Sequence, residues 1–288
     1  MDKQEKFIEL TRDFADAFSS ANYQKALEIA KETVKQYPDL SEPYLRLGIV
    51  YLATGNIHLA YENMLIAEKL AKDETLLILI YNQLGQVLRI MGQYDESLIY
   101  LDKALELMKK LNATNSITYA TILINVASVY KAKGDLKESL FYLKEALNIH
   151  KDGRQSTVIY NNIGTIYQEL GELSEAVKYF HKSIELCEKY GDIHHLLSAK
   201  LNLGNAYREM GDYGNAERYI LDGIKDIKKI GDKYWEATGY FYLGWLYKDK
   251  GDKETAKELL NRAYNLYISV SADTSVKDVL EMIKELGN

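Results

Sequence analysis

The stretch that decides the fold runs from Tyr160 to Phe180 and reads YNNIGTIYQELGELSEAVKYF. Tyr160, Ile163 and Tyr167 lie at i, i+3 and i+7, which is the spacing of one face of an α-helix. Gly171 follows and predicts the end of that helix, because glycine adopts a left-handed cap conformation at little cost. A second apolar series then reaches Phe180, so the stretch predicts a hairpin of two helices.

The same series occurs six times along the chain, at intervals of 37 to 42 residues. Each copy has a small residue in the middle of its first helix, which we call the anchor. The anchors are Gly48, Gly85, Ala127, Gly164, Gly204 and Gly244. Seven residues after each anchor stands a glycine, twelve after it a small residue, and sixteen after it a large apolar residue. An anchor must be small because another helix crosses there, and the small residue at plus twelve lets the second helix lie against the first.

An aspartate or asparagine follows the glycine in several copies, as in Gly211-Asp212, Gly251-Asp252 and Gly55-Asn56. Such side chains accept hydrogen bonds from the free N–H groups at a helix start, so we expect them to cap the second helix.

These residues in register resemble the tetratricopeptide repeat, in a form longer than the usual ~34 residues. The longer form is similar to the repeats of kinesin light chain and of mitotic-spindle adaptor proteins. The resemblance implies an all-α fold, namely a right-handed α-solenoid of about seven helix-turn-helix hairpins with a C-terminal capping helix. In that long-repeat family, asparagines two before and one after the anchor line a groove and hold bound peptides.

We expect one solenoid domain over residues 1–288, because no linker or low-complexity segment divides the chain. Terminal units with a polar outer face are what a stacked array needs for solubility. The expected parts are a degenerate N-terminal capping hairpin (1–40), six clear repeats (41–270) and a C-terminal capping helix (273–286). In the first part Phe14 stands where an anchor would be, and Ala21-Asn22 is the expected turn. The apolar stripe of the last helix is Val276, Val279, Leu280, Ile283 and Leu286.

Composition excludes several classes of protein. The 288 residues include 42 acidic and 36 basic ones, a net charge of −6, which argues against a general nucleic-acid coat. The longest apolar run is Leu76 to Tyr81, whereas a membrane span needs about 20 residues. The charged start is no secretory signal. We therefore expect a cytoplasmic protein with no nucleic-acid partner and no membrane partner.

No catalytic motif is present: the chain lacks a phosphate-binding loop, a nucleophile elbow and a zinc-binding His-Glu-x-x-His sequence. His194 and His195 point in different directions on a helix, so they cannot easily chelate one metal ion. Cys187 is expected to be a buried structural thiol, because no paired base can be named for it. We expect no enzymatic activity, no metal and no cofactor.

Stacked hairpins build an extended concave surface, which the first helices line. The groove should display the positions three and two before the anchor and one and four after it. The candidate peptide-binding residues are Asn82, Gln86, Arg89, Asn125, Ser128, Lys131, Asn161, Asn162, Thr165, Gln168, Asn202, Asn205, Arg208, Trp245 and Lys248.

Two kinds of side chain recur along this predicted groove, carboxamides and basic residues, and each forms a column from repeat to repeat. Carboxamides donate and accept at once, so a row of them can pair with an extended peptide backbone. Four residues after the anchor, a basic column would favour acidic side chains in that peptide. Its members are Arg89, Lys131, Arg208 and Lys248. The alternative is that the asparagines only tune solubility or brace neighbouring helices.

The leading hypothesis is therefore a non-catalytic adaptor that binds an extended, acidic peptide segment of a partner protein. An alternative is a peptide-sensing regulator resembling the Rap and pheromone-receptor family, although only about 40 residues precede the first clear repeat. Another is self-association through the first hairpin, suggested by Phe7, Phe14 and Phe18. A further aromatic cluster, Phe241, Tyr242 and Trp245, forms either a ligand pocket or a surface covered by the last helix.

Overall fold

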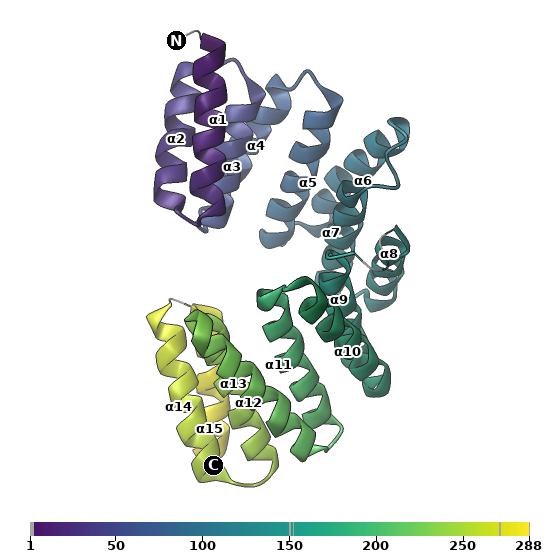
Figure 1. Cartoon of the computed structure of the whole chain (residues 1–288), viewed down its shortest axis with the longest axis vertical. Helices are drawn as coiled ribbons and strands as arrows, with labels where there is room; N and C mark the ends of the chain where they lie inside the picture. Colours follow the sequence, from purple (N-terminus) through teal and green to yellow (C-terminus); the bar gives the residue numbers. More distant parts are fainter. Residues whose placement is uncertain (1–2, 150, 152, 271, 288) are drawn as a thin grey trace. The chain divides into compact units, whose positions relative to one another are not determined.

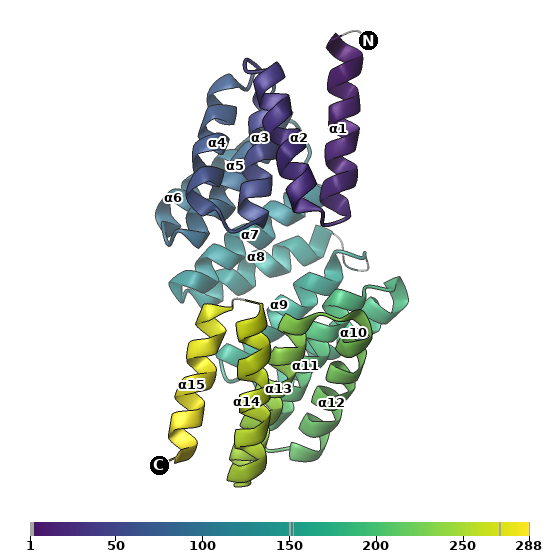
Figure 2. The ribbon, with the colours of Figure 1, turned by 90° about the vertical axis from the view of Figure 1, so that its left-hand side faces the viewer.

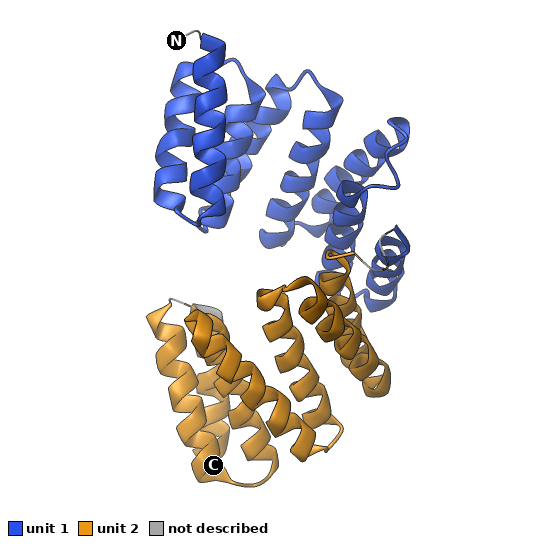
Figure 3. Cartoon of the chain, viewed as in Figure 1, with its two compact units in different colours: residues 1–149 blue, residues 150–288 orange. Residues whose placement is uncertain are grey.

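The computed structural model describes residues 3–149, 151, 153–270 and 272–287, and every regular element in them is an α-helix (Figure 1). The chain divides into two compact units, Met1–Ile149 and His150–Asn288 (Figure 3). Unit 1 contains α1 (Lys3–Ser19), α2 (Tyr23–Gln36), α3 (Ser41–Ala53), α4 (Ile57–Leu70), α5 (Glu74–Ile90), α6 (Tyr94–Lys110), α7 (Ile117–Lys133) and α8 (Leu136–Ile149). Unit 2 contains α9 (Ser156–Glu169), α10 (Leu173–Tyr190), α11 (Ile193–Glu209), α12 (Tyr213–Ile230), α13 (Lys233–Asp249), α14 (Lys253–Ser269) and α15 (Asp273–Gly287).

Consecutive helices pair as hairpins, from α1 with α2 to α13 with α14, and α15 packs on α14 (Figure 2). Successive first helices also contact one another, α3 with α5 and α5 with α7 in unit 1, and α9 with α11 and α11 with α13 in unit 2. No two successive second helices approach as closely within the described residues. In each unit the first helices therefore line the inner face, as the repeat predicts.

The anchors sit where the two helices of a hairpin come closest. A Cβ atom placed on Gly164 would stand 2.6 Å from Cε1 of Phe180, and one on Gly85 would stand 2.5 Å from Cγ of Leu101. Both distances are far below van der Waals contact, so the large residue sixteen after the anchor occupies the space that a side chain would need. Ser97, twelve after its anchor, donates from Oγ to the carbonyl of Gly85 over 2.6 Å. The predicted close crossing is confirmed.

Helix ends follow the predicted chemistry with one exception. Gly171 has a φ of 76°, in the left-handed region that favours glycine. Asp212 and Asp252 cap α12 and α14, accepting backbone N–H bonds at 3.1 Å. The cap prediction is wrong for Asn56, whose amide donates to the carbonyl of Thr54 and makes no cap bond.

The first and last helices of the described chain pack on their neighbours through apolar side chains. Phe14 is buried in the first hairpin, and Ala21 makes its turn with a φ of 55°. On α15, Val279 and Leu286 are buried as expected. Leu280 was predicted to be buried and is 37% exposed, because the helix packs through the face that carries Met282. Among the helices described, none is both long and apolar enough to cross a membrane.

Candidate functional site

The inner face of unit 1 carries an amide pair between successive first helices. Asn125 on α7 donates from Nδ2 to Oδ1 of Asn82 on α5 over 2.7 Å, and Asn82 is buried. Ser128 donates its hydroxyl to the carbonyl of Ile124 in its own helix, at 2.8 Å. The pair braces α5 against α7, so bracing is one role of these asparagines, as the alternative interpretation held.

Two other predicted groove residues of unit 1, Gln86 and Arg89, are open to solvent or to a ligand. Gln86 and Arg89 are half-buried, and neither makes a hydrogen bond or ion pair with a residue that the structure describes. Lys131 is also half-buried on the next first helix, α7. Arg89 therefore presents an uncompensated positive charge on the inner face.

Unit 2 has an amide pair of the same kind, again between two successive first helices. Asn202 on α11 donates from Nδ2 to Oδ1 of Asn161 on α9 over 3.1 Å. Thr165 donates its hydroxyl to the carbonyl of Asn161 at 3.0 Å. Asn162 is half-buried and has no hydrogen bond to a described residue. Each unit thus has one amide pair that braces two successive first helices.

The basic residue Arg208 is packed into unit 2, with 7% of its surface exposed. Its Nε donates to Oδ1 of Asn205 over 2.9 Å, and its guanidinium forms an ion pair with Asp249. The same group lies 4.1 Å above the ring of Trp245. Lys248 is likewise paired, with Glu285 of α15. The charges of these two predicted groove cations are compensated within the unit.

Arg208 differs from Arg89 because carboxylates lie beside it, and these carboxylates were not among the predicted groove residues. Glu209 accepts hydrogen bonds from Nε2 of Gln168 at 2.8 Å and from Nδ2 of Asn205 at 3.1 Å. Glu209 and Asp249 each stand five residues after an anchor, as does Glu169. In unit 1 the same position holds Ala53, Ile90 and Ala132. The sequence does contain a signal for these carboxylates: acidic residues recur five after the anchor, next to the basic position four after it.

A cavity of about 360 Å³ opens on the inner face of unit 2, and we call it the inner cavity. It is lined by Thr165, Gln168, Glu169, Asn202, Asn205, Glu209 and Tyr242. Burial raises the pKa of Tyr242, and nearby Tyr234 and then Glu209 raise it further. Of the predicted aromatic cluster, Tyr242 lines the cavity, whereas Trp245 contacts Arg208 and lies 5.8 Å from Phe241.

A family model described as tetratricopeptide repeat matches residues 76–152, 155–225 and 196–269, more than half of the chain. The protein belongs to the tetratricopeptide repeat (TPR) family. The human clustered mitochondria protein homolog is 28% identical over 145 residues, which are 48% of this chain and 11% of that protein. Kinesin Light Chain-Related 1 of Arabidopsis thaliana is 25% identical over 163 residues, covering 52% of this chain and 27% of that one. The chain thus spans a small part of these relatives.

Among solved structures, a Rap protein complexed with Competence and Sporulation Factor has the same fold. Its TM-score is 0.65 at 14% sequence identity, and the match covers 98% of each chain. The kinesin light chain relative supports the long-repeat resemblance found in the sequence. As a TPR array, the protein is a protein–protein interaction scaffold.

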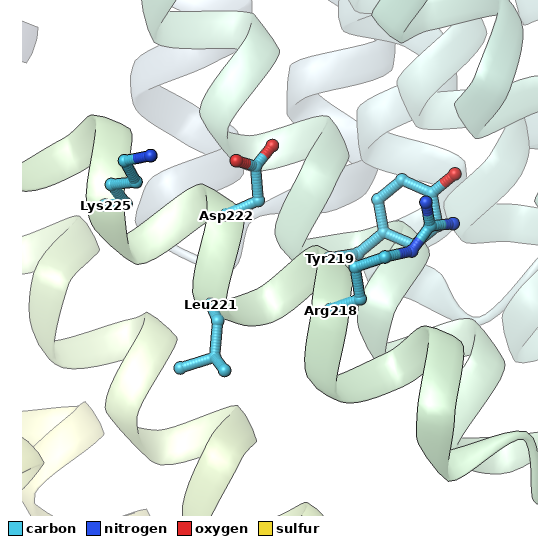
Figure 4. Close-up of a pocket in the computed structure, with 5 residues that line it drawn as sticks. All are labelled: Arg218, Tyr219, Leu221, Asp222 and Lys225. Carbon is cyan, nitrogen blue, oxygen red and sulfur yellow. The ribbon is translucent and has the colours of Figure 1, made fainter.

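A second hollow of this TPR protein, of about 530 Å³, runs along the second helix α12 (Figure 4). Figure 4 shows Arg218, Tyr219, Asp222 and Lys225 along it. Asp222 accepts a hydrogen bond at 2.6 Å from the ammonium of Lys200, a lysine buried on α11. The acidic part of this hollow therefore holds α12 on α11.

The single thiol is structural. Cys187 is fully buried on α10, and burial raises its pKa to about 11, so it stays protonated at neutral pH. This confirms the expected buried thiol. Within the described part of the chain, no group of three or more His, Cys, Asp or Glu residues is placed to hold a metal ion.

Proposed function

We propose that this TPR protein is a non-catalytic adaptor that binds an extended segment of a partner protein along the inner face of its first helices. The observation that carries the proposal is the amide column on that face. Asn162 and Gln86 have no hydrogen bond to a described residue, so their donors and acceptors are available to a peptide backbone.

Charge supports a preference for acidic side chains at the inner face of unit 1. Arg89, four residues after its anchor, has no carboxylate partner among the residues described. A partly buried cation without a fixed counter-charge gains from a carboxylate supplied by a ligand, because charge-assisted hydrogen bonds are the stronger kind.

A second candidate function is regulation of the Rap type. The observation that favours it is the fold match over 98% of both chains. Specific retention of this protein on promoter DNA, weakened by a bound peptide, would support it over an adaptor. A purified protein that binds peptides but no such target would exclude it.

Self-association through the first hairpin receives less support from the contacts. Phe14 stacks on Phe18 at 5.8 Å, and Phe7 lies against Tyr37 at 5.0 Å. These rings are used within unit 1, so we propose a monomeric scaffold. A mass in light scattering that rises with concentration would contradict it.

The experiment is a selection of phage-displayed octapeptides on the purified full chain, followed by affinity measurements with the best peptide. Gln86→Ala and Arg89→Glu, both in unit 1, are the test variants, because neither residue makes a hydrogen bond or ion pair with a described residue. We expect each to weaken binding on the order of tenfold, a loss typical of one hydrogen bond to a charged or buried partner.

Matched controls lie on the second helix α8. Asn148→Ala removes an exposed amide, and Lys137→Glu reverses an exposed charge. We expect both to bind like the wild type. Equal affinity of all four variants would place the site away from the inner face and defeat the proposal.

A further inference from the structure

A cavity of about 270 Å³ lies between the second helices α6 and α8 of unit 1, and we call it the α6–α8 cavity. Its lining includes Asp102 and Glu106 of α6, Leu123 of α7, and Phe141, Tyr142 and Glu145 of α8. Leu123 is buried, whereas Phe141 is 56% exposed. The cavity thus combines a buried apolar residue and an exposed aromatic ring with charged groups.

Three carboxylates of this cavity have no partner in the described part of the chain. Asp102, Glu106 and Glu145 make no hydrogen bond or ion pair with a described residue. Lys109 is the one cation among the described lining residues, and it is exposed. Burial, and then the charge of Glu106, raise the pKa of Asp102 more than Lys109 lowers it. The negative charge of the cavity is therefore not balanced from within.

The carboxylates of the two helices converge on one tyrosine. Burial first, then Tyr130 and the charges of Asp102 and Glu145, raise the pKa of Tyr142. Asp102 comes from α6 and Glu145 from α8, so the carboxylates approach the ring of Tyr142 from both sides of the cavity. A cation placed at this ring meets negative charge from both helices.

The same repeat positions of unit 2 show where a cation is held. Tyr219 corresponds to Tyr142, each standing fifteen residues after its anchor. The guanidinium of Arg218 lies 4.5 Å from the centre of the Tyr219 ring. In unit 1 the position of Arg218 is taken by Phe141, and no cation of a described residue lies over the ring of Tyr142.

A second cation of unit 2 is also replaced in unit 1. Asp222 corresponds to Glu145, each standing eighteen residues after its anchor. The ammonium of Lys200 donates to Asp222 over 2.6 Å. In unit 1 the position of Lys200 holds Leu123, which lines the cavity. Two apolar residues therefore stand in unit 1 where unit 2 has an arginine and a lysine.

We propose that the α6–α8 cavity binds an arginine side chain of a second partner protein. Its guanidinium takes the role that Arg218 and Lys200 have in unit 2. A guanidinium stacks on aromatic rings and donates several N–H bonds in a rigid fork, which suits Phe141 beside carboxylates of two helices. Because the bond is charge-assisted, it is of the stronger kind.

This inference goes beyond the proposed function, because the cavity lies between second helices and the peptide-binding face lies on first helices. A scaffold with these two surfaces holds an acidic segment on one and a basic segment on the other. It can therefore join two different partners.

The test is a selection of phage-displayed octapeptides on the full chain carrying Gln86→Ala and Arg89→Glu, which remove the proposed inner-face contacts. We expect arginine to be enriched at one peptide position. Replacing that arginine by citrulline, which keeps the shape without the charge, should weaken binding about tenfold. Lysine at that position with an affinity equal to that of arginine would overturn the assignment of a guanidinium.

Variants of the carboxylates locate the site. In the same background we expect Glu145→Gln and Asp102→Asn each to reduce the enrichment of arginine, because each removes one unpaired charge from the cavity. Glu62→Gln removes an exposed carboxylate of α4, a second helix outside the cavity, and is the matched control that should keep the enrichment. Far-ultraviolet circular dichroism checks that all variants are equally helical.

A further variant gives unit 1 the internal cation of unit 2. Phe141→Arg should abolish the selection of arginine, because a guanidinium of the chain itself then covers Tyr142. Phe141 is exposed, so the change leaves the core intact. Phe141→Gln removes the ring without adding charge, and we expect it to weaken binding only about threefold.

Each contrary result has a defined meaning. The absence of arginine enrichment, or its persistence in both Glu145→Gln and Asp102→Asn, overturns the cavity assignment and leaves the inner-face proposal to its own test. An equal loss in Phe141→Gln and Phe141→Arg also overturns it, because the ring rather than the charge then holds the ligand.

Discussion

The inner faces of the two units are built from the same repeat positions, yet their cations meet different neighbours. In unit 1, Arg89 has no ion-pair partner among the described residues. In unit 2, Arg208 stands at the same position and is paired with Asp249, packed on Trp245 and 7% exposed. Arg89 is therefore available to a ligand, whereas Arg208 is part of the packing of unit 2.

This difference follows from one position of the repeat, five residues after the anchor. In unit 2 the residue four after an anchor bonds to the residue five after the next anchor, Gln168 to Glu209 and Arg208 to Asp249. The residue that corresponds to Asp249 for Arg89 is Ala132. The contrast between Arg89 and Arg208 therefore follows from whether the next repeat supplies a carboxylate at this position.

Removing the acid should have the largest effect. Asp249→Ala leaves the buried Arg208 with only its longer contact to Glu209, at 3.4 Å, and we expect a loss of about 2 kcal/mol in unfolding free energy, because a buried charge then loses its shorter ion pair. Urea unfolding followed by circular dichroism measures it.

The control for this variant is Asp95→Ala. Its partner Lys133 lies at 2.7 Å, but Asp95 is 83% exposed, so the expected loss is within about 0.5 kcal/mol. Equal losses in the two variants would mean that burial does not distinguish the pairs.

The amide braces provide the next comparison. Asn82 is buried, whereas Asn161 and Asn202 are half-buried, so water can replace a lost partner more easily in unit 2. We expect a coupling energy of about 1 kcal/mol for Asn82 with Asn125 and about half of that for Asn161 with Asn202. Double-mutant cycles in urea measure both, and a larger coupling in unit 2 would reverse this ranking.

The sequence predicted what depends on periodicity and on close neighbours. The hairpins, the small anchors, the glycine ends and the aspartate caps all depend on residues within one repeat, such as Gly164 and Phe180. The ion pair of Arg208 joins residues 41 positions apart, so it depends on how one repeat stacks on the next. The packing face of α15 was predicted with one error, because Leu280 and Met282 are both apolar and only the surface of α14 decides between them.

A similar ion pair can be introduced into unit 1, and we expect it to have a smaller effect on stability. Ala132→Glu places a carboxylate in unit 1 at the position that Asp249 has in unit 2. We expect it to change the unfolding free energy by about 0.5 kcal/mol, as a partly exposed pair does. It should also weaken peptides selected for acidic residues on the wild type, because Arg89 gains an internal partner. Ala132→Gln is the uncharged control, and an equal loss of binding in it would point to steric hindrance instead.

The smallest expected effect is a pH dependence of opposite sign in the two units. Hydrogen bonds from Lys229 and then Lys200 lower the pKa of Asp226 in unit 2. Its ionised form is favoured by folding, so this contribution is present above the unfolded pKa and is lost as pH falls through the folded pKa. Burial, and then Glu106, raises the pKa of Asp102 in unit 1. Folding favours its protonated form, so that contribution is present below the unfolded pKa, near 4, and is lost as pH rises through the folded pKa.

Two isosteric variants separate these contributions. At pH 7, Asp226→Asn should lower the urea midpoint, because it removes a carboxylate that is stabilised by two lysines. Asp102→Asn should raise the midpoint at pH 7, because it removes a charge that burial and Glu106 disfavour. Both variants should converge on the wild type as the pH falls toward the pKa values of the carboxyls, where the wild-type groups are themselves neutral. Midpoints measured from pH 7 to pH 3 test the signs, and shifts in the same direction for both variants would show that the carboxyls of the two units meet similar surroundings.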